Sequence, residues 1–275
     1  MSDAIVTWVD GQRADSVPTD DRGLQYGDGL FETILLRGGK ARFLEAHLSR
    51  LASGCTRLAI PFRGESELRA EIAAAAAQAP HLAVLKVIVT RGSATRRGYA
   101  PDGEAPRRVV SLYETAALAP ELRAGVELVF ATGTVAEHPG LAGLKHLSRL
   151  ENVWAMGEAR AAGAFDALLC MASEQLVSGA MTNFFMVRAG KVLTPPVDRA
   201  GVAGVMRQVV LRECSALGIV AIEQSLRAHD LATADEAFVT NARIGVVPVR
   251  RVGEHAFHMN TLARRLADHV EALDA

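Results

Sequence analysis

The sequence has little cysteine and no long apolar stretch, and both shortages limit where the protein can work. Its 275 residues include three widely spaced cysteines, Cys55, Cys170 and Cys214. They form neither a CxxC motif nor a disulfide framework, which suits a reducing compartment. No apolar run approaches the roughly 20 residues that a membrane-spanning helix needs. The first residues, MSDAIVTWVDGQ, carry acids where a signal peptide carries basic residues, so we expect a cytoplasmic protein.

The chain also lacks an excess of either charge. Its 30 lysines and arginines balance 31 acidic residues, and no block of like charge occurs. A nucleic-acid or membrane-surface binder needs a basic face for its affinity. We therefore expect no nucleic-acid partner and no membrane partner. Hydrophobic residues make up 49% and charged residues 22% of the chain, which is typical of a folded globular protein.

Motifs for metals and nucleotides are missing too. A Walker loop and GxGxxG are absent, so nucleotide-binding folds have no motif in their favour. His255 and His258 are three residues apart, but no Cys, Asp or Glu pattern completes a ligand set, and HExxH is absent. We interpret these histidines as surface residues and expect no metal site.

Hydrophobic periodicity predicts an α+β protein in two parts. Runs with β-branched or alternating residues predict strands, and apolar residues three or four apart predict helices. Ser66 is a plausible N-cap for the second helix. In the first part we expect strands over 4–9, 30–36, 41–44, 83–90 and 107–113, and helices over 44–58 and 66–79.

Residues 114–121 are typical of a linker, and they divide the chain into expected domains 1–117 and 118–275. The second domain then contains the candidate lysine, Lys145, and the candidate anion site in residues 194–207, both described below. There we expect strands over 126–132, 166–172, 183–188, 191–193, 219–223 and 236–240, and helices over 147–163, 204–217 and 260–273.

One glycine-rich junction is a candidate anion site. The segment TPPVDRAGVAGVMR, residues 194–207, runs from a strand end through a loop into a helix. The first amides of a helix have no partner within it, and the helix dipole places positive charge behind them, so a phosphate can bind there. The alternative is that Gly201 and Gly204 only shape a tight turn.

Lys145 is the candidate nucleophile, in the segment GLAGLKHLSRLEN. A lysine among apolar neighbours loses charge stabilisation, and its amine becomes nucleophilic toward an aldehyde. An ordinary surface lysine is the alternative. Arg50, with His47 one turn earlier on the same helix, is a second candidate anion-binding group. Its alternative is a solvated helix arginine.

Several segments together resemble the class IV pyridoxal-phosphate enzymes, the group of branched-chain aminotransferases, D-amino-acid aminotransferases and 4-amino-4-deoxychorismate lyases. The resemblance covers nearly the whole chain and keeps the family's order and spacing. The segments are DRGLQYGDGLFET (21–33), AHLSRL (46–51), RGSATRRGY (91–99), LAGLKHLSRLEN (141–152), GAMTNFF (179–185), TPPVDRAGVAGVMR (194–207) and TNARIGVVPV (240–249).

The resemblance implies two α/β domains of the class IV fold, pyridoxal 5'-phosphate as cofactor and a homodimer. By position, Lys145 resembles the lysine that forms the Schiff base with the cofactor, and Arg50 the arginine that grips its phosphate. The other cofactor-binding positions that the resemblance implies are Ser178, Asn183, Val205, Met206, Asn241 and Ala242.

Within the family, LAGLKHLSRLE most resembles the aminodeoxychorismate lyases. Branched-chain enzymes usually have a tyrosine five residues after the lysine, where this chain has Leu150. Many members place a glutamate against the pyridine nitrogen, where this chain has Ser178, and a hydroxyl cannot supply that charge. Glu174 is four residues upstream, in an expected hairpin turn. The alternative activity is an aminotransferase for D-amino or branched-chain amino acids.

The lyase resemblance implies conversion of 4-amino-4-deoxychorismate to 4-aminobenzoate and pyruvate, in folate biosynthesis. This substrate has two carboxylates, so cationic and hydroxyl partners are expected. Arg108 is the leading candidate. The other expected substrate-binding residues are Tyr26, Arg91, Arg97, Tyr99 and His146. For Tyr26 a half-buried turn aromatic, and for His146 a structural hydrogen-bonding role, are the alternatives.

Overall fold

The computed structural model describes residues 4–96, 98–101 and 105–273, which form two compact units. The first unit contains the described residues up to Ala117 together with Leu144–Ser148, and the second contains the rest from Leu118 onward. From the sequence we expected Lys145 in the second domain. In the structure its segment groups with the first unit, because its backbone bonds to a strand there.

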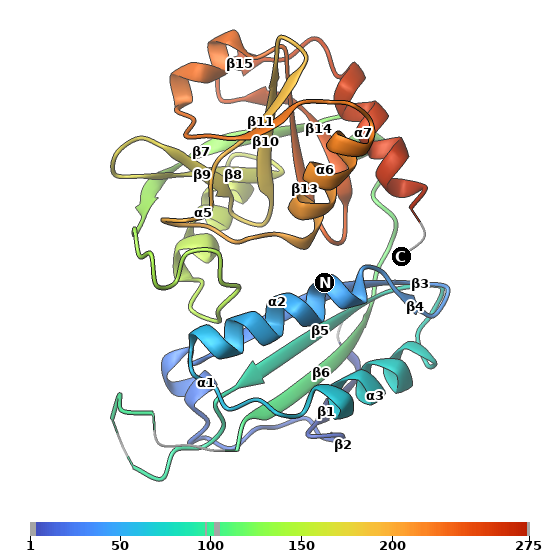
Figure 1. Ribbon diagram of the computed structural model, residues 1–275, viewed down its shortest axis with the longest axis vertical. Coiled ribbons are helices and arrows are strands. Elements are labelled where there is room, and N and C mark those ends of the chain that lie inside the picture. Colours follow the sequence, from blue (N-terminus) through green and yellow to red (C-terminus); the bar gives the residue numbers. More distant parts are fainter. Residues whose placement is uncertain (1–3, 97, 102–104, 274–275) are drawn as a thin grey trace. The chain divides into compact units, whose positions relative to one another are not determined.

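In the first unit, six of the described strands form one antiparallel sheet in the order β2-β1-β6-β5-β3-β4 (Figure 1). The long central pairing aligns Gly29 with Thr90 and Arg37 with Leu82. The strands are β1 (Ala4–Val9), β2 (Gln12–Arg13), β3 (Gly29–Arg37), β4 (Lys40–Ala41), β5 (Leu82–Thr90) and β6 (Arg107–Glu114).

Two long helices pack on this sheet, α2 (Leu44–Arg57) against β3 and α3 (Glu65–Ala76) against β6 (Figure 1). Helix α2 buries residues at helical spacing, including Leu48, Leu51 and Cys55. The expected N-cap of α3 was wrong. Gly64 occupies that position, and the Ser66 hydroxyl donates to Glu67 instead. A short helix, α1 (Arg22–Tyr26), precedes β3 and begins at the N-cap Asp21.

In the second unit, the described strands form a nine-stranded mixed sheet with the path β12-β11-β10-β13-β14-β7-β8-β9, and β15 pairs with β14. The pairs β11/β12, β7/β14 and β7/β8 are parallel. The strands are β7 (Val126–Val135), β8 (Asp166–Met171), β9 (Leu176–Gly179), β10 (Asn183–Arg188), β11 (Lys191–Thr194), β12 (Ala221–Glu223), β13 (Glu236–Asn241), β14 (Gly245–Val252) and β15 (His255–Ala256).

Helix α5 (Leu150–Ala161) packs on β7 and β8, while α6 (Val205–Ala216) and α7 (Thr261–Glu271) pack on β13 and on each other. The expected helix over 147–163 begins three residues late, because Leu147 bonds to β3 of the first unit. The short helices α4 (Pro120–Ala124) and η1 (Ala228–Thr233) complete the unit. None of the helices in the described part is long and apolar enough to cross a membrane.

The sheet of the second unit contains a fully buried carboxylate, that of Asp166. Asp166 begins β8 and accepts hydrogen bonds from the Thr182 hydroxyl at 2.7 Å and the Ala167 amide at 2.8 Å. A Cβ on Gly179 would lie 2.3 Å from Asp166 Oδ2, so this close approach requires glycine. Burial raises the pKa of Asp166 from 3.8 to about 6, even though the hydrogen-bond donors oppose the shift.

This buried acid predicts a pH-dependent stability. The folded chain holds the Asp166 proton more tightly than the unfolded chain. Its contribution to stability is therefore largest below its ordinary pKa of 3.8 and falls as the pH rises through about 6. Relative to Asp166→Asn, the free energy of unfolding of the wild type should fall by about 1–3 kcal/mol between pH 4 and pH 7. Urea denaturation across this range measures it. The exposed Asp268→Asn serves as control, and curves for Asp166→Asn that run parallel to the wild type contradict the assignment.

Candidate active site

Backbone hydrogen bonds hold the Lys145 segment beside β3. The Phe31 amide donates to the Lys145 carbonyl at 2.9 Å, and the Leu147 amide donates to the Gly29 carbonyl at 3.0 Å. His146 forms the bridge between them, opposite Leu30. Because main-chain groups make these bonds, the position of Lys145 does not depend on its own side chain.

The Lys145 side chain lies against an aromatic ring. Its Nζ is 4.1 Å from the centroid of the Phe31 ring, and the neighbouring Leu144 is buried. A ring face attracts an ammonium group while excluding water from one side of it. The expected apolar setting of Lys145 is thus present in the first unit.

Helix α2 brings two further groups to the same strand. Its residues His47 and Arg50 are one turn apart and both contact Glu32, which follows Phe31 on β3 and is only 1% exposed. Arg50 Nε donates to Glu32 Oε1 at 2.8 Å, and a second guanidinium nitrogen pairs with Oε2. His47 Nδ1 lies 2.6 Å from Oε2. Glu32 therefore fixes the orientation of Arg50.

In this cluster, the environment favours the ionised form of Glu32 and the neutral form of His47. Burial alone raises the pKa of Glu32, but His47 and Arg50 outweigh it and hold that pKa below its ordinary value of 4.5. Burial lowers the pKa of His47, with Glu32 opposing and the positive charges of Arg50 and Lys145 adding to the fall. We assign an ionised Glu32 and a neutral His47 whose Nδ1–H donates to it. His47 Nε2 is then a buried acceptor with no partner among the described residues.

Sequence reasoning missed Glu32. A signal existed, because β3 is otherwise buried and apolar at the positions Leu30, Ile34 and Leu36 on the same alternation. An acid at such a position is almost always paired. The helical partner that it needed, Arg50, was already a candidate.

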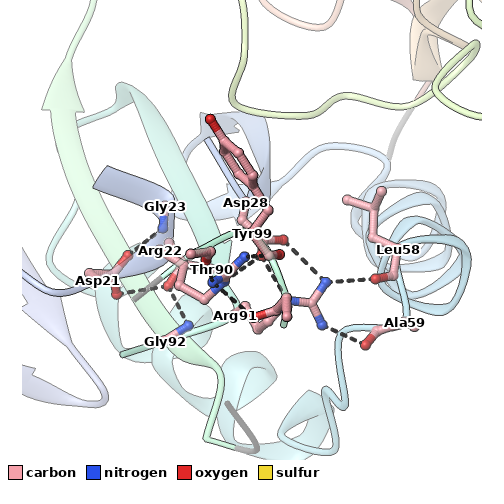
Figure 2. Close-up of polar contacts among 12 residues, drawn as sticks. Asp21, Arg22, Gly23, Asp28, Leu58, Ala59, Thr90, Arg91, Gly92 and Tyr99 are labelled. Atoms are coloured by element: carbon pink, nitrogen blue, oxygen red, sulfur yellow. Dashed lines mark hydrogen bonds and ion pairs between the residues drawn. The ribbon is translucent and has the colours of Figure 1, made fainter. Parts of the chain in front are cut away.

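Two of the expected substrate-binding arginines have structural partners. Arg91 is buried, pairs with Asp28, and donates to the carbonyls of Leu58 and Ala59 at 2.7 Å each (Figure 2). Arg108 forms a two-nitrogen ion pair with Glu71, which comes from α3.

The expected tyrosines do come together. The Tyr26 and Tyr99 rings meet edge to face, with centroids 5.5 Å apart. Tyr26 ends α1, and Tyr99 lies on the loop between β5 and β6. Arg97, expected on the same loop, is outside the described residues.

In the second unit, the expected anion site lies at the start of α6. Gly204 is the N-cap and offers no side chain, so the first amides of the helix, from Val205 onward, have no partner within it. A Cβ on Gly204 would lie 2.0 Å from Asn183 Oδ1. Asn183 Nδ2 also donates to the Val202 carbonyl at 2.9 Å. Asn183 thus shapes the turn that leads into the helix.

The loop after β13 lies beside this turn. In the sheet, Thr240 is the register partner of Asn183, and its hydroxyl is buried with no partner among the described residues. Asn241 Oδ1 accepts the amides of Arg243 and Ile244 at 3.0 Å each, which closes the loop around Ala242. Strand pairing therefore places the 240–242 loop next to the start of α6.

Ser178 is the residue that the sequence resemblance sets at the expected glutamate position. It lies buried on β9, and its hydroxyl donates to the Gly179 carbonyl at 2.8 Å. Glu174 lies in the turn between β8 and β9, as expected, where it is exposed and has a φ of 62°. Ser178 therefore brings no negative charge to this strand.

The Glu32 cluster predicts a strong effect on stability. Glu32→Gln removes the charge between His47 and Arg50, and breaking a buried pair costs about 3–5 kcal/mol. We expect a loss of about 2–4 kcal/mol at pH 7, because the amide keeps one hydrogen bond. A lowered folded pKa stabilises above its ordinary value, so the loss should shrink as the pH falls below 4.5. Denaturant unfolding measures it. Glu45 is an exposed carboxylate that pairs with Arg69, and Glu45→Gln should change the free energy of unfolding little. An equal loss of stability in both variants would contradict the role of Glu32.

Comparisons with known proteins identify the family to which the chain belongs. The family model "Amino-transferase class IV" matches residues 29–252. The chain is 34% identical over 266 residues to the aminodeoxychorismate lyase of Vibrio harveyi, covering 94% of this chain and 97% of that one. It is 31% identical over 236 residues to a putative branched-chain-amino-acid aminotransferase of Methanocaldococcus jannaschii, covering 83% and 80%.

Among solved structures, the 4-amino-4-deoxychorismate lyase of Pseudomonas aeruginosa superposes with a TM-score of 0.91. It is 42% identical to this chain, with 98% of this chain and 100% of that chain covered. The α+β fold with two sheets is therefore that of the class IV aminotransferase structures. The chain belongs to the class IV aminotransferase family, which uses pyridoxal phosphate.

Proposed function

We propose that the protein binds pyridoxal phosphate and acts as an aminodeoxychorismate lyase, which converts 4-amino-4-deoxychorismate to 4-aminobenzoate and pyruvate in folate biosynthesis. The observation that carries the proposal is Lys145, held by backbone bonds against Phe31, in a chain 42% identical over nearly its full length to the Pseudomonas lyase. The Vibrio relative of the same name adds support.

The described residues fit the cofactor. In the second unit, the amides of Val205 and Met206 at the helix start are suited to a phosphate, as is the Thr240 hydroxyl, which has no partner among the described residues. Asn183, Asn241 and Ala242 shape that cup. In the first unit, Lys145 is the amine for the cofactor aldehyde, and Arg50 is a cation for its phosphate. When bound, pyridoxal phosphate supplies an aldehyde that condenses with amines and a ring that accepts an electron pair.

The chain's own groups then have distinct tasks. With the cofactor and substrate bound, the Lys145 amine would remove the proton from the amine-bearing carbon of the substrate as a general base. The bond between the substrate's ring carbon and its enolpyruvyl oxygen breaks, and the substrate ring becomes aromatic. The enolpyruvate takes up one proton to become pyruvate, and Lys145 is the candidate donor. Glu32 keeps Arg50 in one orientation throughout.

The substrate carboxylates need partners, which we assign to the loop and helix ends of the first unit. The structure makes Tyr99 and Tyr26 the leading candidates for binding the substrate carboxylates, because both rings are exposed at the surface. His146, beside Lys145, is a further candidate, as is Arg97. Arg91 and Arg108 remain candidates only if substrate competes with their present carboxylate partners.

A homodimer belongs to the proposal. Helix α5 exposes three large apolar side chains on one stretch, Leu150 at 83%, Val153 at 65% and Trp154 at 70%. An exposed apolar surface of this kind marks an interaction site. A second copy of the chain is the expected partner, and light scattering during gel filtration tests it.

The runner-up activity is an aminotransferase for D-amino or branched-chain amino acids. The observation that favours it is the 31% identity to the putative branched-chain enzyme. Adding an amino acid alone separates the two activities. An aminotransferase converts the bound cofactor to its pyridoxamine form, whereas a lyase returns the aldehyde.

The lyase proposal predicts the loss of both products in one lysine variant. The purified protein, given aminodeoxychorismate made in situ by its synthase, should release pyruvate and 4-aminobenzoate in equal amounts. Lys145→Ala should release neither, because the general base is gone. Lys86 is a matched control, since its Nζ lies 5.7 Å from the same Phe31 ring centroid, and Lys86→Ala should keep the activity. A wild type that binds the cofactor but releases neither product refutes the lyase proposal.

Ser178 predicts a shift in reaction type. A carboxylate near the pyridine nitrogen keeps it protonated and strengthens the ring as an electron acceptor, which transamination needs more than an elimination that forms an aromatic ring. Ser178→Glu should therefore raise the ratio of aminotransferase to lyase activity. Glu174→Gln, which alters an exposed turn residue, should leave the ratio unchanged. An unchanged or lower ratio in Ser178→Glu means that the weaker acceptor does not decide the reaction.

A further inference from the structure

Arg22 makes an unusual set of contacts with an exposed loop. Its guanidinium donates to three consecutive backbone carbonyls, at 3.0 Å to Gly98, 3.0 Å to Tyr99 and 3.4 Å to Ala100. The Arg22 side chain itself is buried, and the residue is 2% exposed. A buried arginine in α1 thus binds the backbone of the loop between β5 and β6.

Arg22 is itself fixed from several sides. Its Nε donates to Asp28 at 2.8 Å, and Asp28 is held in turn by Arg91 (Figure 2). The Arg22 amide donates to the Gly92 carbonyl at 2.9 Å, where the same loop begins. Burial alone raises the pKa of Asp28, but Arg91 and Arg22 outweigh it and lower that pKa, so the carboxylate stays ionised between them.

The loop residue with chemistry to offer is Tyr99. Its side chain is 87% exposed, so burial does not hold it in place. The contacts that locate it are the Arg22 bond to its carbonyl and the edge of the Tyr26 ring. Arg22 also lies over the face of that Tyr26 ring, 4.9 Å from its centroid. One guanidinium therefore locates both tyrosines.

We propose that Arg22 is a positioning residue, which holds the 98–100 backbone and the Tyr26 ring so that the two phenols are ready for a carboxylate-bearing substrate. This inference rests on the proposed function, in which Tyr99 contacts that substrate. The planar fork of arginine is essential, because one group must serve a carboxylate and three carbonyls at once. Lysine keeps the charge but cannot reproduce this geometry.

Arg22→Lys tests the inference in the holoenzyme. The KM for aminodeoxychorismate should rise about tenfold, which corresponds to about 1.4 kcal/mol, while kcat changes little. The visible absorption of bound pyridoxal phosphate should be unchanged. Hydrogen exchange of the peptide that contains residues 98–101 should become faster. Arg107→Lys is the matched control, because Arg107 is a partly buried arginine of the same unit that pairs with Asp10 and Asp21. It should change neither KM nor the exchange of that peptide.

A double variant separates positioning from general loosening. If Arg22 acts through the two phenols, then Arg22→Lys should add little to the KM of the double variant Tyr26→Phe, Tyr99→Phe, since both changes remove the same interactions. Additive effects on KM, a fall in kcat alone, or unchanged exchange of the 98–101 peptide overturn the inference. A wild type that releases neither product refutes the proposed function and with it the substrate role of Tyr99. The exchange measurement then decides separately whether Arg22 holds the loop.

Discussion

The buried carboxylate of Glu32 is the contact on which the candidate chemistry of the first unit depends. It joins β3 to α2 through His47 and Arg50, and it follows Phe31, the residue whose amide and ring both contact Lys145. A buried ionised carboxylate is stable only when it is paired and hydrogen-bonded in this way. The same three residues therefore stabilise the sheet–helix packing and orient the cation that we assign to phosphate binding.

The second unit forms its candidate anion site in a different way. Here the candidate site consists of neutral groups: a glycine N-cap, helix amides and an asparagine that lies between two loops. Asn183 is the central residue, because strand pairing sets it opposite Thr240 while its side chain shapes the turn before α6. A cup of backbone dipoles needs no long charged side chain and loses little conformational freedom on binding.

Local pattern was enough to predict most elements. Helix α2 and strands β1, β3, β5 and β10 lie within about two residues of their expected bounds, because their apolar spacing agrees with their packing. Helix α5 starts late for a reason that no local pattern contains, the bond of Leu147 to a strand more than a hundred residues earlier. The same long-range contact moves Lys145 into the first unit.

The sequence predicted the candidate site residues that lie in motifs. It did not predict the roles of residues that depend on partners distant in the chain. Lys145, Arg50 and the α6 start came from motifs. Arg108 and Arg91 were reasonable candidates as cations, yet each proved to have a carboxylate partner from a distant segment, Glu71 and Asp28. Arg22 and Glu32 were overlooked because their importance lies in contacts across 76 and 18 positions of the chain.

Chemical trapping tests directly whether Lys145 binds the cofactor, as we propose. Protein loaded with pyridoxal phosphate is reduced with borohydride, digested and analysed by mass spectrometry. We expect one modified peptide, with the pyridoxyl group on Lys145. Modification of Lys86 or another lysine instead, or no modified peptide from protein that retains the cofactor's absorption, would contradict it.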